Sequence, residues 1–190
     1  LSKKIGPEMA DILATASDEQ IAELVQNIDK RNKKFKSKYV DIPLESLAEK
    51  RKERLTKDIK QWISRLTAEQ KQAVSDWSDQ ITPLAADGLR YRERVLTEFQ
   101  NLLTKQRQAP DFKEAFVALL VNFDQMRTRE YQQKIDFNTD LTLKLLIKID
   151  RSLNATQRTY LLKRIGSMAA DFDKLSCDPV QVKSTRNEGN

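Results

Sequence analysis

Apolar residues recur at helical spacing along almost the whole chain, and this spacing constrains the fold more than any other feature of the sequence. Between residues 18 and 39, for example, Ile21, Leu24, Val25, Ile28 and Phe35 fall on one face of a helix. No stretch alternates apolar and polar residues for long enough to indicate a strand. The sequence therefore predicts an all-α protein.

The same spacing predicts seven helices, with a shorter eighth near the N-terminus. Proline interrupts the pattern at Pro43, Pro83 and Pro110, because it lacks a backbone donor and clashes with the preceding turn. The apolar faces cover residues 18–39, 44–63, 74–81, 84–102, 112–123, 131–149 and 161–175, and the short helix covers 7–14. We expect these helices to pack as an irregular antiparallel bundle or array.

The chain shows no internal linker, and at 190 residues it can bury one substantial core. We therefore predict a single helical domain over residues 1–175. Residues 176–190 have little apolar content and are predicted to be a disordered C-terminal tail. Within the domain, Leu44 and Trp62 are expected to face inward, and the helix at 112–123 to be buried on most sides.

Three polar residues occupy positions on apolar faces where an apolar side chain is expected. These are Asn32, Arg51 and Asn138. A buried amide or guanidinium needs hydrogen-bond partners, so we expect each of them to link two helices and fix their register, or to line a ligand pocket.

Three helices are preceded by the same local pattern, in which Ser17, Thr67 or Asn154 is followed three residues later by Gln. The short polar side chain can cap the helix, and the Gln can bond back to the backbone of the capping residue. Capping boxes alone explain this spacing.

The second of these segments, 66–70 (LTAEQ), also resembles the LTxxQ motif of the Spy and CpxP periplasmic proteins, which are helical chaperones and stress adaptors that work without ATP. A broader pattern resembles a family of uncharacterised bacterial lipoproteins. It covers roughly residues 13–175 and is carried by segments 17–24, 31–32, 49–55 and 62–70, by Trp77, and by segments 91–92 and 153–158.

That resemblance implies a signal peptide, a lipid-modified Cys, and a helical domain of unknown function facing the periplasm. The chain itself contains no lipobox Cys, so the resemblance places Leu1 downstream of the anchor. Lipid anchoring in a full-length precursor is thus an expectation drawn from the family. The longest apolar run, 115–121, is too short to cross a bilayer.

Positive charge is concentrated in two segments. Residues 29–38 carry a net +5 and residues 50–57 carry +4, which leaves −3 for the rest of a chain whose overall charge is +6. If the helices around them pack as an antiparallel hairpin, the two segments lie at the same end of the molecule. The candidate binding residues are Lys30, Arg31, Lys33, Lys34, Lys36, Lys38, Lys50, Arg51, Lys52 and Arg54.

These cations have two interpretations. They form a solvated face whose long stems cover apolar surface, or they form a patch for anions. The patch would bind an acidic envelope protein, or an anionic lipid or lipopolysaccharide surface. Nucleic acid is disfavoured because no recognition motif or aromatic platform accompanies the charges, and Phe35 and Tyr39 are expected on the core face.

Composition argues against an enzyme. The chain has no His, which excludes His-based triads and imidazole metal ligands, and its one Cys excludes an internal disulfide and thiolate clusters. Only 4 Gly are present, and no phosphate-binding glycine motif occurs. We expect no cofactor and no metal.

Three functions remain in view: a non-enzymatic envelope lipoprotein that binds another envelope component, a periplasmic chaperone or adaptor of the Spy and CpxP type, and a cytosolic basic module for nucleic acid.

Overall fold

The computed structural model describes residues 2–177, and this part of the chain forms eight α-helices with no strand. The helices are α1 (Ser2–Thr15), α2 (Asp18–Tyr39), α3 (Leu44–Ile63), α4 (Ala68–Gln80), α5 (Ala85–Asn101), α6 (Phe112–Val121), α7 (Arg129–Arg151) and α8 (Ala155–Cys177). A π-helical turn, Leu102–Gln106, extends α5, and a short 3-10 helix, Phe123–Met126, precedes α7. The all-α prediction is confirmed.

Capping side chains mark the starts of four of the eight described helices, α2, α4, α7 and α8. Both bonds of a capping box are present at Ser17, Thr67 and Asn154, so all three predicted boxes are confirmed. Thr128 caps α7 by accepting a hydrogen bond from the Tyr131 backbone. α3 begins directly after Pro43.

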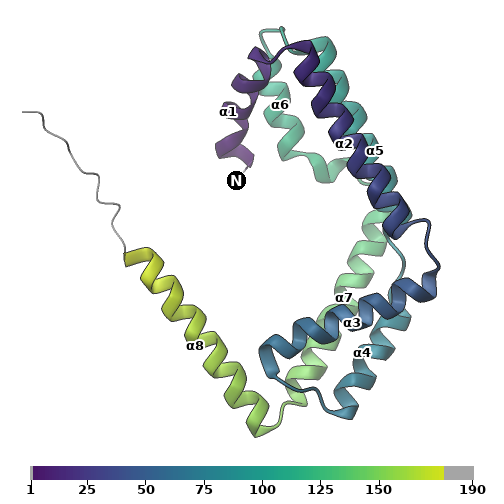
Figure 1. Cartoon of the computed structure of the whole chain (residues 1–190), viewed down its shortest axis with the longest axis vertical. Coiled ribbons are helices and arrows are strands. Elements are labelled where there is room, and N and C mark those ends of the chain that lie inside the picture. The colour runs from purple at the N-terminus through teal and green to yellow at the C-terminus, as the bar shows by residue number, and fades with distance from the viewer. Residues whose placement is uncertain (1, 178–190) are drawn as a thin grey trace, which may run out of the picture.

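The helices form two groups, each with its own buried apolar cluster (Figure 1). α1, α2, α5 and α6 gather at one end, where Phe116 and Leu103 are almost fully buried. α3, α4 and α7 form the other group around residues such as Val74 and Ile63. The prediction of one domain over 1–175 stays a prediction.

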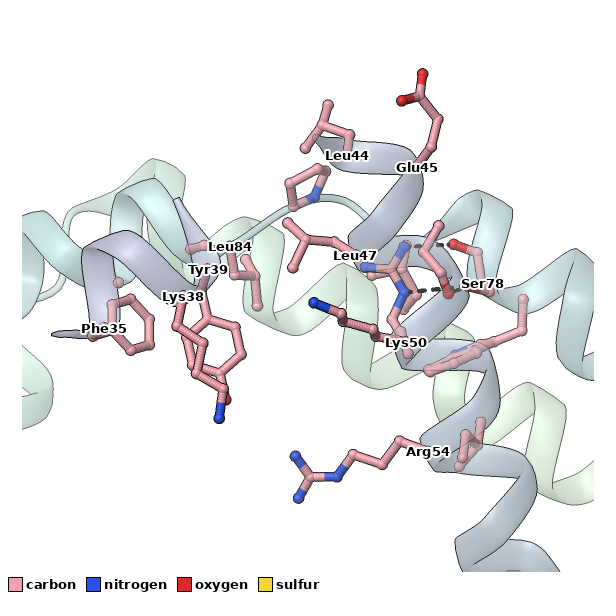
Figure 2. A pocket seen from close by; sticks show the side chains of 18 of the residues that line it. Phe35, Lys38, Tyr39, Leu44, Glu45, Leu47, Lys50, Arg54, Ser78 and Leu84 are labelled. Atoms are coloured by element: carbon pink, nitrogen blue, oxygen red, sulfur yellow. Dashed lines mark hydrogen bonds between the residues drawn. The ribbon is translucent and has the colours of Figure 1, made fainter. Parts of the chain in front are cut away.

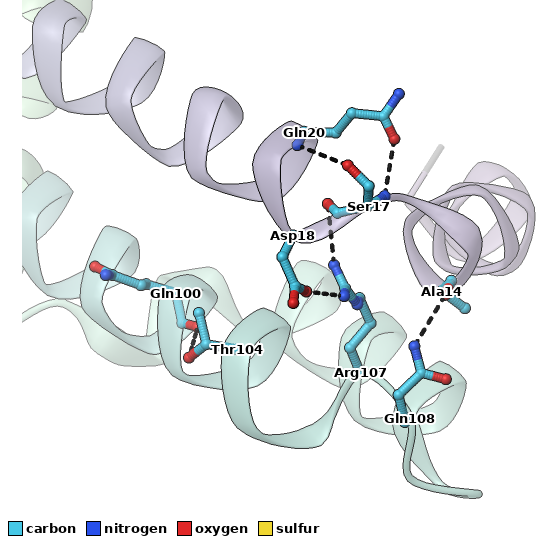
Figure 3. A network of polar contacts seen from close by, with 8 residues as sticks. All are labelled: Ala14, Ser17, Asp18, Gln20, Gln100, Thr104, Arg107 and Gln108. Carbon is cyan, nitrogen blue, oxygen red and sulfur yellow. Dashed lines mark hydrogen bonds and ion pairs between the residues drawn. The ribbon is translucent and has the colours of Figure 1, made fainter.

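Figure 3 shows how the junction of α1 and α2 is held against the end of the π-helical turn. Arg107 donates to the Ser17 carbonyl at 3.4 Å and pairs with Asp18, while the Gln108 side chain donates to the Ala14 carbonyl. The contacts join segments about 90 residues apart in the chain, so they position α2 relative to α5.

α8 packs differently from the other long helices. Its first turns contact α3 and the cluster that contains Leu161, and the rest of the helix leads away from the other helices (Figure 1). The disordered tail predicted at 176–190 stays a prediction: α8 continues to Cys177, and the remainder lies outside the described residues.

Several burial predictions were wrong in detail. Leu44 is 61% exposed because it is the first residue of α3, and Trp62 is 40% exposed near its end. α6 buries Phe112 and Phe116 but leaves Val121 at the surface.

None of the described helices is both long enough and apolar enough to span a bilayer.

Candidate functional site

A cleft of about 1060 Å³ lies where the end of α2, the first half of α3 and the start of α5 meet (Figure 2). Ligand pockets in proteins are typically about 300–1,000 Å³. The cleft is thus large enough for a sizeable ligand or an acyl chain.

The walls of the cleft are mostly apolar and aromatic. Phe35 and Tyr39 from α2 stand with ring centroids 5.0 Å apart, and Leu55 and Trp77 line the opposite wall. The sequence-based assignment of Phe35 and Tyr39 to a core face was therefore wrong, since both are half-buried and line the cleft.

Gly88 lies at a point where neighbouring side chains approach the backbone of α5 closely. A Cβ at this position would lie 3.2 Å from the hydroxyl of Tyr131 and 4.0 Å from the Phe35 ring. Because Gly88 has no Cβ, α5 can approach α7 and α2 at this point, and Tyr131 becomes part of the cleft lining.

Cations surround the mouth of the cleft. Figure 2 shows Lys50 and Arg54 pointing from α3 towards the side of the cleft that Lys38 and Tyr39 occupy. Arg92 from α5 stacks over the Phe35 ring at 4.5 Å, and the Lys38 amine lies 5.1 Å from the Tyr39 ring centroid. Cations and aromatic faces therefore lie together at this surface.

Three of these cations lack an ion-pair partner within the described part of the chain. Among the described residues, no acidic group lies within 4.0 Å of Lys38, Lys50 or Arg92. Arg54 has only a loose pair with Asp58, at 4.0 Å. The cleft lining contains five basic and three acidic residues, so its mouth is electropositive.

Arg51 lines the same cleft but has a structural role. Its guanidinium donates to the Ser78 carbonyl at 2.8 Å, and the Ser78 hydroxyl donates to the Ala48 carbonyl at 2.9 Å. Burial lowers the pKa of Arg51, and nearby Asp79 partly opposes that shift. Arg51 thus joins α3 to α4, as predicted for a polar residue on an apolar face.

The other two predicted links differ in outcome. The Asn138 side chain bonds the Thr82 backbone in both directions, at 2.9 and 2.8 Å, and so joins α7 to the connection between α4 and α5. Asn32 is buried, but its Nδ2 has no hydrogen-bond partner in the described part of the chain. The predicted link through Asn32 Nδ2 is therefore absent.

The ten predicted binding residues divide into two sets. Lys38, Lys50, Arg51 and Arg54 line the cleft, whereas Lys30, Arg31, Lys33, Lys34, Lys36 and Lys52 lie outside it. Three of the second set are paired locally: Lys33 with Asp29, Lys36 with Asp41, and Lys52 with Glu49. For those three the solvated-face interpretation fits.

The two basic helices do not pack as the antiparallel hairpin that would bring their basic segments to one end of the molecule. α2 packs along α5, and α3 packs on α4 and α8, so the two basic segments approach each other across the cleft. Sequence reasoning missed Arg92, Gly88 and Tyr131 for the same reason. Their place in the site depends on long-range helix contacts, and the only local signal is that Arg92 lies one turn after Gly88 on α5.

Asp87 forms the most buried ion pairs near the site. Its carboxylate binds the Lys134 amine at 2.7 Å and also pairs with Arg90. The hydrogen bond from Lys134, with a smaller contribution from Arg90, lowers the pKa of Asp87. These contacts hold α5 to α7 behind the cleft.

The LTxxQ-like segment participates in a separate structural contact. Gln70 and Gln157, the third helical residues of two capping boxes, exchange amide hydrogen bonds at 3.1 and 2.8 Å while remaining almost fully buried. Each also donates to the chain just before the other box, Gln70 to Ser152 and Gln157 to the Arg65 carbonyl at 2.6 Å. The two boxes thus form a pseudo-two-fold contact between the α3–α4 and α7–α8 connections.

No cluster of three or more His, Cys, Asp or Glu residues suited to a metal occurs among the described residues. The cleft offers cations, aromatic rings and aliphatic side chains, which are groups that bind and orient a ligand. Fold and cleft together define an all-α protein with an apolar cleft and a cationic mouth.

A model of a family of unknown function, DUF6279, matches residues 1–132, and the chain belongs to that family. The matched region includes every residue that lines the cleft. No curated protein and no solved structure matches the chain.

Proposed function

We propose that this chain is a non-enzymatic binding domain of the bacterial cell envelope, facing the periplasm and lipid-anchored in its full-length precursor. Its ligand is an anionic lipid or the lipid portion of lipopolysaccharide, with an acyl chain in the cleft and a phosphate at the mouth. The observation that carries this proposal is the combination of aromatic walls with the unpaired Lys38, Lys50 and Arg92.

The chemistry of the cleft favours a lipid over an acidic protein. Apolar walls gain free energy by removing an acyl chain from water, at about 25 cal/mol per Å² of apolar surface. Exposed cations attract a phosphate but contribute little by themselves in water. A ligand that presents both groups uses both parts of the site, whereas an acidic peptide uses the rim alone.

The test compares two triple variants with the same change in charge. Lys38→Gln/Lys50→Gln/Arg54→Gln removes three cations from the cleft, and Lys30→Gln/Lys33→Gln/Lys34→Gln removes three from the exposed face of α2. We expect binding to phosphatidylglycerol vesicles, measured by co-sedimentation, to fall strongly for the first variant and slightly for the second. Equal losses would mean that attraction is diffuse, which would contradict a cleft site.

Occupation of the cleft itself is measured through Trp77. The chain has two Trp, and Trp62→Phe leaves Trp77 as the sole reporter. Titration with a short-chain phosphatidic acid should shift the Trp77 emission, and a zwitterionic lipid of equal chain length should shift it less. If the Trp77 emission is unchanged while vesicle binding is intact, the lipid does not enter the cleft. The proposed site is then wrong, and the outer surface would bind another envelope partner.

The envelope location has its own test. The sequence encoded upstream of Leu1 should contain a signal peptide and a lipobox Cys. If it contains neither, the envelope proposal fails even if lipid binding holds.

A second candidate function is an ATP-independent periplasmic chaperone or stress adaptor of the Spy and CpxP type. The observation that favours it is a set of exposed apolar side chains on the last two helices: Phe137, Leu143, Leu146, Ile147, Leu162, Ile165, Phe172 and Leu175. Near-stoichiometric suppression of aggregation of a reduced, unfolding client would support it. No suppression would leave the lipid-binding role alone.

A further inference from the structure

The apolar residues of α8 form a narrow seam along one side of the helix. Leu161, Ile165, Met168, Phe172 and Leu175 are spaced alternately four and three residues apart. This is the heptad spacing that brings one helix against another along its length.

Most of this seam has no partner among the residues that the structure describes. Leu161 packs on the cluster formed by α3, α4 and α7, but Ile165 is 49% exposed, Phe172 65% and Leu175 77%. Figure 1 shows the corresponding part of α8 leading away from the other helices. Helices in proteins owe most of their stability to packing of an apolar face, so this face is typical of one that pairs.

The charges beside the seam indicate which partner fits. Arg164 and Asp171 are one heptad apart and flank the same edge, whereas Leu162 and Ala169 flank the other edge. Arg164 has no acidic group within 4.0 Å among the residues that the structure describes, and Asp171 meets only Lys174, at 4.0 Å. One edge of the seam therefore carries one positive and one negative charge in series.

Such an edge is complementary to itself when it is reversed. In a two-fold antiparallel pair the same edges face each other, so Arg164 of one copy meets Asp171 of the second copy, and the contact occurs twice. The same register sets Ile165 against Met168 and Leu161 against Phe172 of the second copy. A parallel pair would instead place Arg164 beside the uncharged edge that contains Ala169.

We propose that two copies of this chain associate through an antiparallel pair of α8 helices, with Ile165, Met168 and Phe172 at its centre and two Arg164–Asp171 ion pairs along one edge. The proposal is independent of the cleft, because the seam residues do not line it. It also bears on the chaperone candidate, since a paired α8 covers part of the apolar surface on which that candidate rests.

Sedimentation equilibrium on the full chain, over a wide range of concentration, tests the pairing. We expect a monomer–dimer equilibrium for the unaltered chain. Arg164→Asp alone sets Asp against Asp, and Asp171→Arg alone sets Arg against Arg, so each should weaken association by about tenfold or more. An equimolar mixture of the two variants should restore association as a heterodimer, and so should the double variant within one chain.

Lys163→Asp is the matched control, because it makes the same charge change on the side of α8 away from the seam. It should associate like the unaltered chain. The restoration by mixing is specific for antiparallel pairing, since only that arrangement brings residues 164 and 171 together. Equal association of the two single reversals and the unaltered chain would overturn the proposal, as would a monomer at all concentrations.

A second variant tests the apolar centre. Ile165→Ser/Phe172→Ser alters exposed side chains, so the helical circular dichroism should change little while dimers disappear. If this variant still dimerises, the interface lies elsewhere and the proposal is wrong. Binding to anionic vesicles gives a separate reading, because loss of dimers with intact lipid binding, or the reverse, separates this proposal from the proposed function.

Discussion

The capping boxes at Ser17 and at Thr67 have nearly the same local geometry and very different surroundings. In both, the backbone N–H of the capping residue donates to the Gln side-chain oxygen at 2.9 Å. Gln20 is exposed, whereas Gln70 is 1% exposed and bonded to Gln157 across 87 residues of sequence. A motif that caps a helix at one site therefore also joins the α3–α4 and α7–α8 connections at another.

The difference has a physical reason. An exposed amide exchanges its protein partners for water at little cost, but a buried amide that loses a partner retains the full penalty of desolvation. The Ser17 box is held from outside by Arg107, which bonds the Ser17 carbonyl and pairs with Asp18. The Thr67 box is instead held by its own Gln70, which bonds Gln157. The same residue type should thus differ in its contribution to stability.

The largest effect is expected for Gln70→Met. The change keeps the length of the side chain but removes the partner of the Thr67 N–H and both bonds that Gln157 shares with Gln70. We expect it to lower the free energy of unfolding by about 3 kcal/mol. Urea denaturation measures it. A loss no larger than that of the exposed Gln20 would contradict the structural role of the buried pair.

The second-largest expected effect is the energetic coupling between the buried side-chain amides of Gln70 and Gln157. Gln157→Met alone should be strongly destabilising, but the double variant Gln70→Met/Gln157→Met should lose less than the two single losses together, by about 1–2 kcal/mol. The reason is that each single change already breaks the two hydrogen bonds between the amides, so the second change cannot lose them again. As a control, Gln20→Ala and Gln157→Met should be additive within about 0.5 kcal/mol, because the two sites are not in contact.

Asp87 supplies a charged counterpart to the neutral amide pair. Because its folded pKa is lowered by Lys134, Asp87 stabilises the fold above its unfolded pKa of about 3.9, and this contribution is lost as the pH falls through the lower folded value. Asp87→Asn should cost on the order of 1 kcal/mol at neutral pH and reduce the loss of stability in acid. Urea denaturation at a series of pH values checks this.

The exposed Asp140, paired with Lys144, is the control for that experiment. Asp140→Asn should change the acid dependence little, since a solvated ion pair contributes little. Equal effects of Asp87→Asn and Asp140→Asn would show that burial of Asp87 does not matter. The Gln70–Gln157 pair has no titrating group, so the deficit of Gln70→Met should be the same at every pH.

The smallest effect is expected for Gln20→Ala. It removes one capping-box hydrogen bond from an exposed helix start and should cost about 0.5 kcal/mol. Arg107→Gln, which removes the clamp seen in Figure 3, should cost more than Gln20→Ala. The opposite order would mean that the local box, and not the contact with the π-helical turn, holds the α1–α2 junction.

Much of the fold was predictable because its signals are local. α2 occupies the predicted span, and α3, α5 and α7 lie close to theirs, since apolar spacing, prolines and capping residues act within a few residues of each other. α1 is longer than the short helix expected at 7–14. The burial of single residues was less predictable. Leu146, Ile165 and Phe172 lie on apolar faces yet are exposed, because the pattern of a helix does not tell whether a neighbour covers it.

The candidate site was predictable only in part. Charge counting identified Lys38, Lys50 and Arg54, but it also identified six cations that lie outside the cleft. It could not find Arg92 or Tyr131, because their places depend on α5 packing beside α2 and on Gly88 admitting the Tyr131 ring. Proximity between residues 50 or more apart in the chain leaves no local mark on the sequence.

By itself, then, the sequence determined that the chain is helical, where most helices begin, and which segments carry the positive charge, because backbone hydrogen bonding, capping and composition act at short range. Only the tertiary structure decided which cations face a common cleft, which capping Gln residues meet in the interior, and which apolar faces stay open. Those outcomes depend on how helices cross, and crossing is set by the packing of all their side chains together.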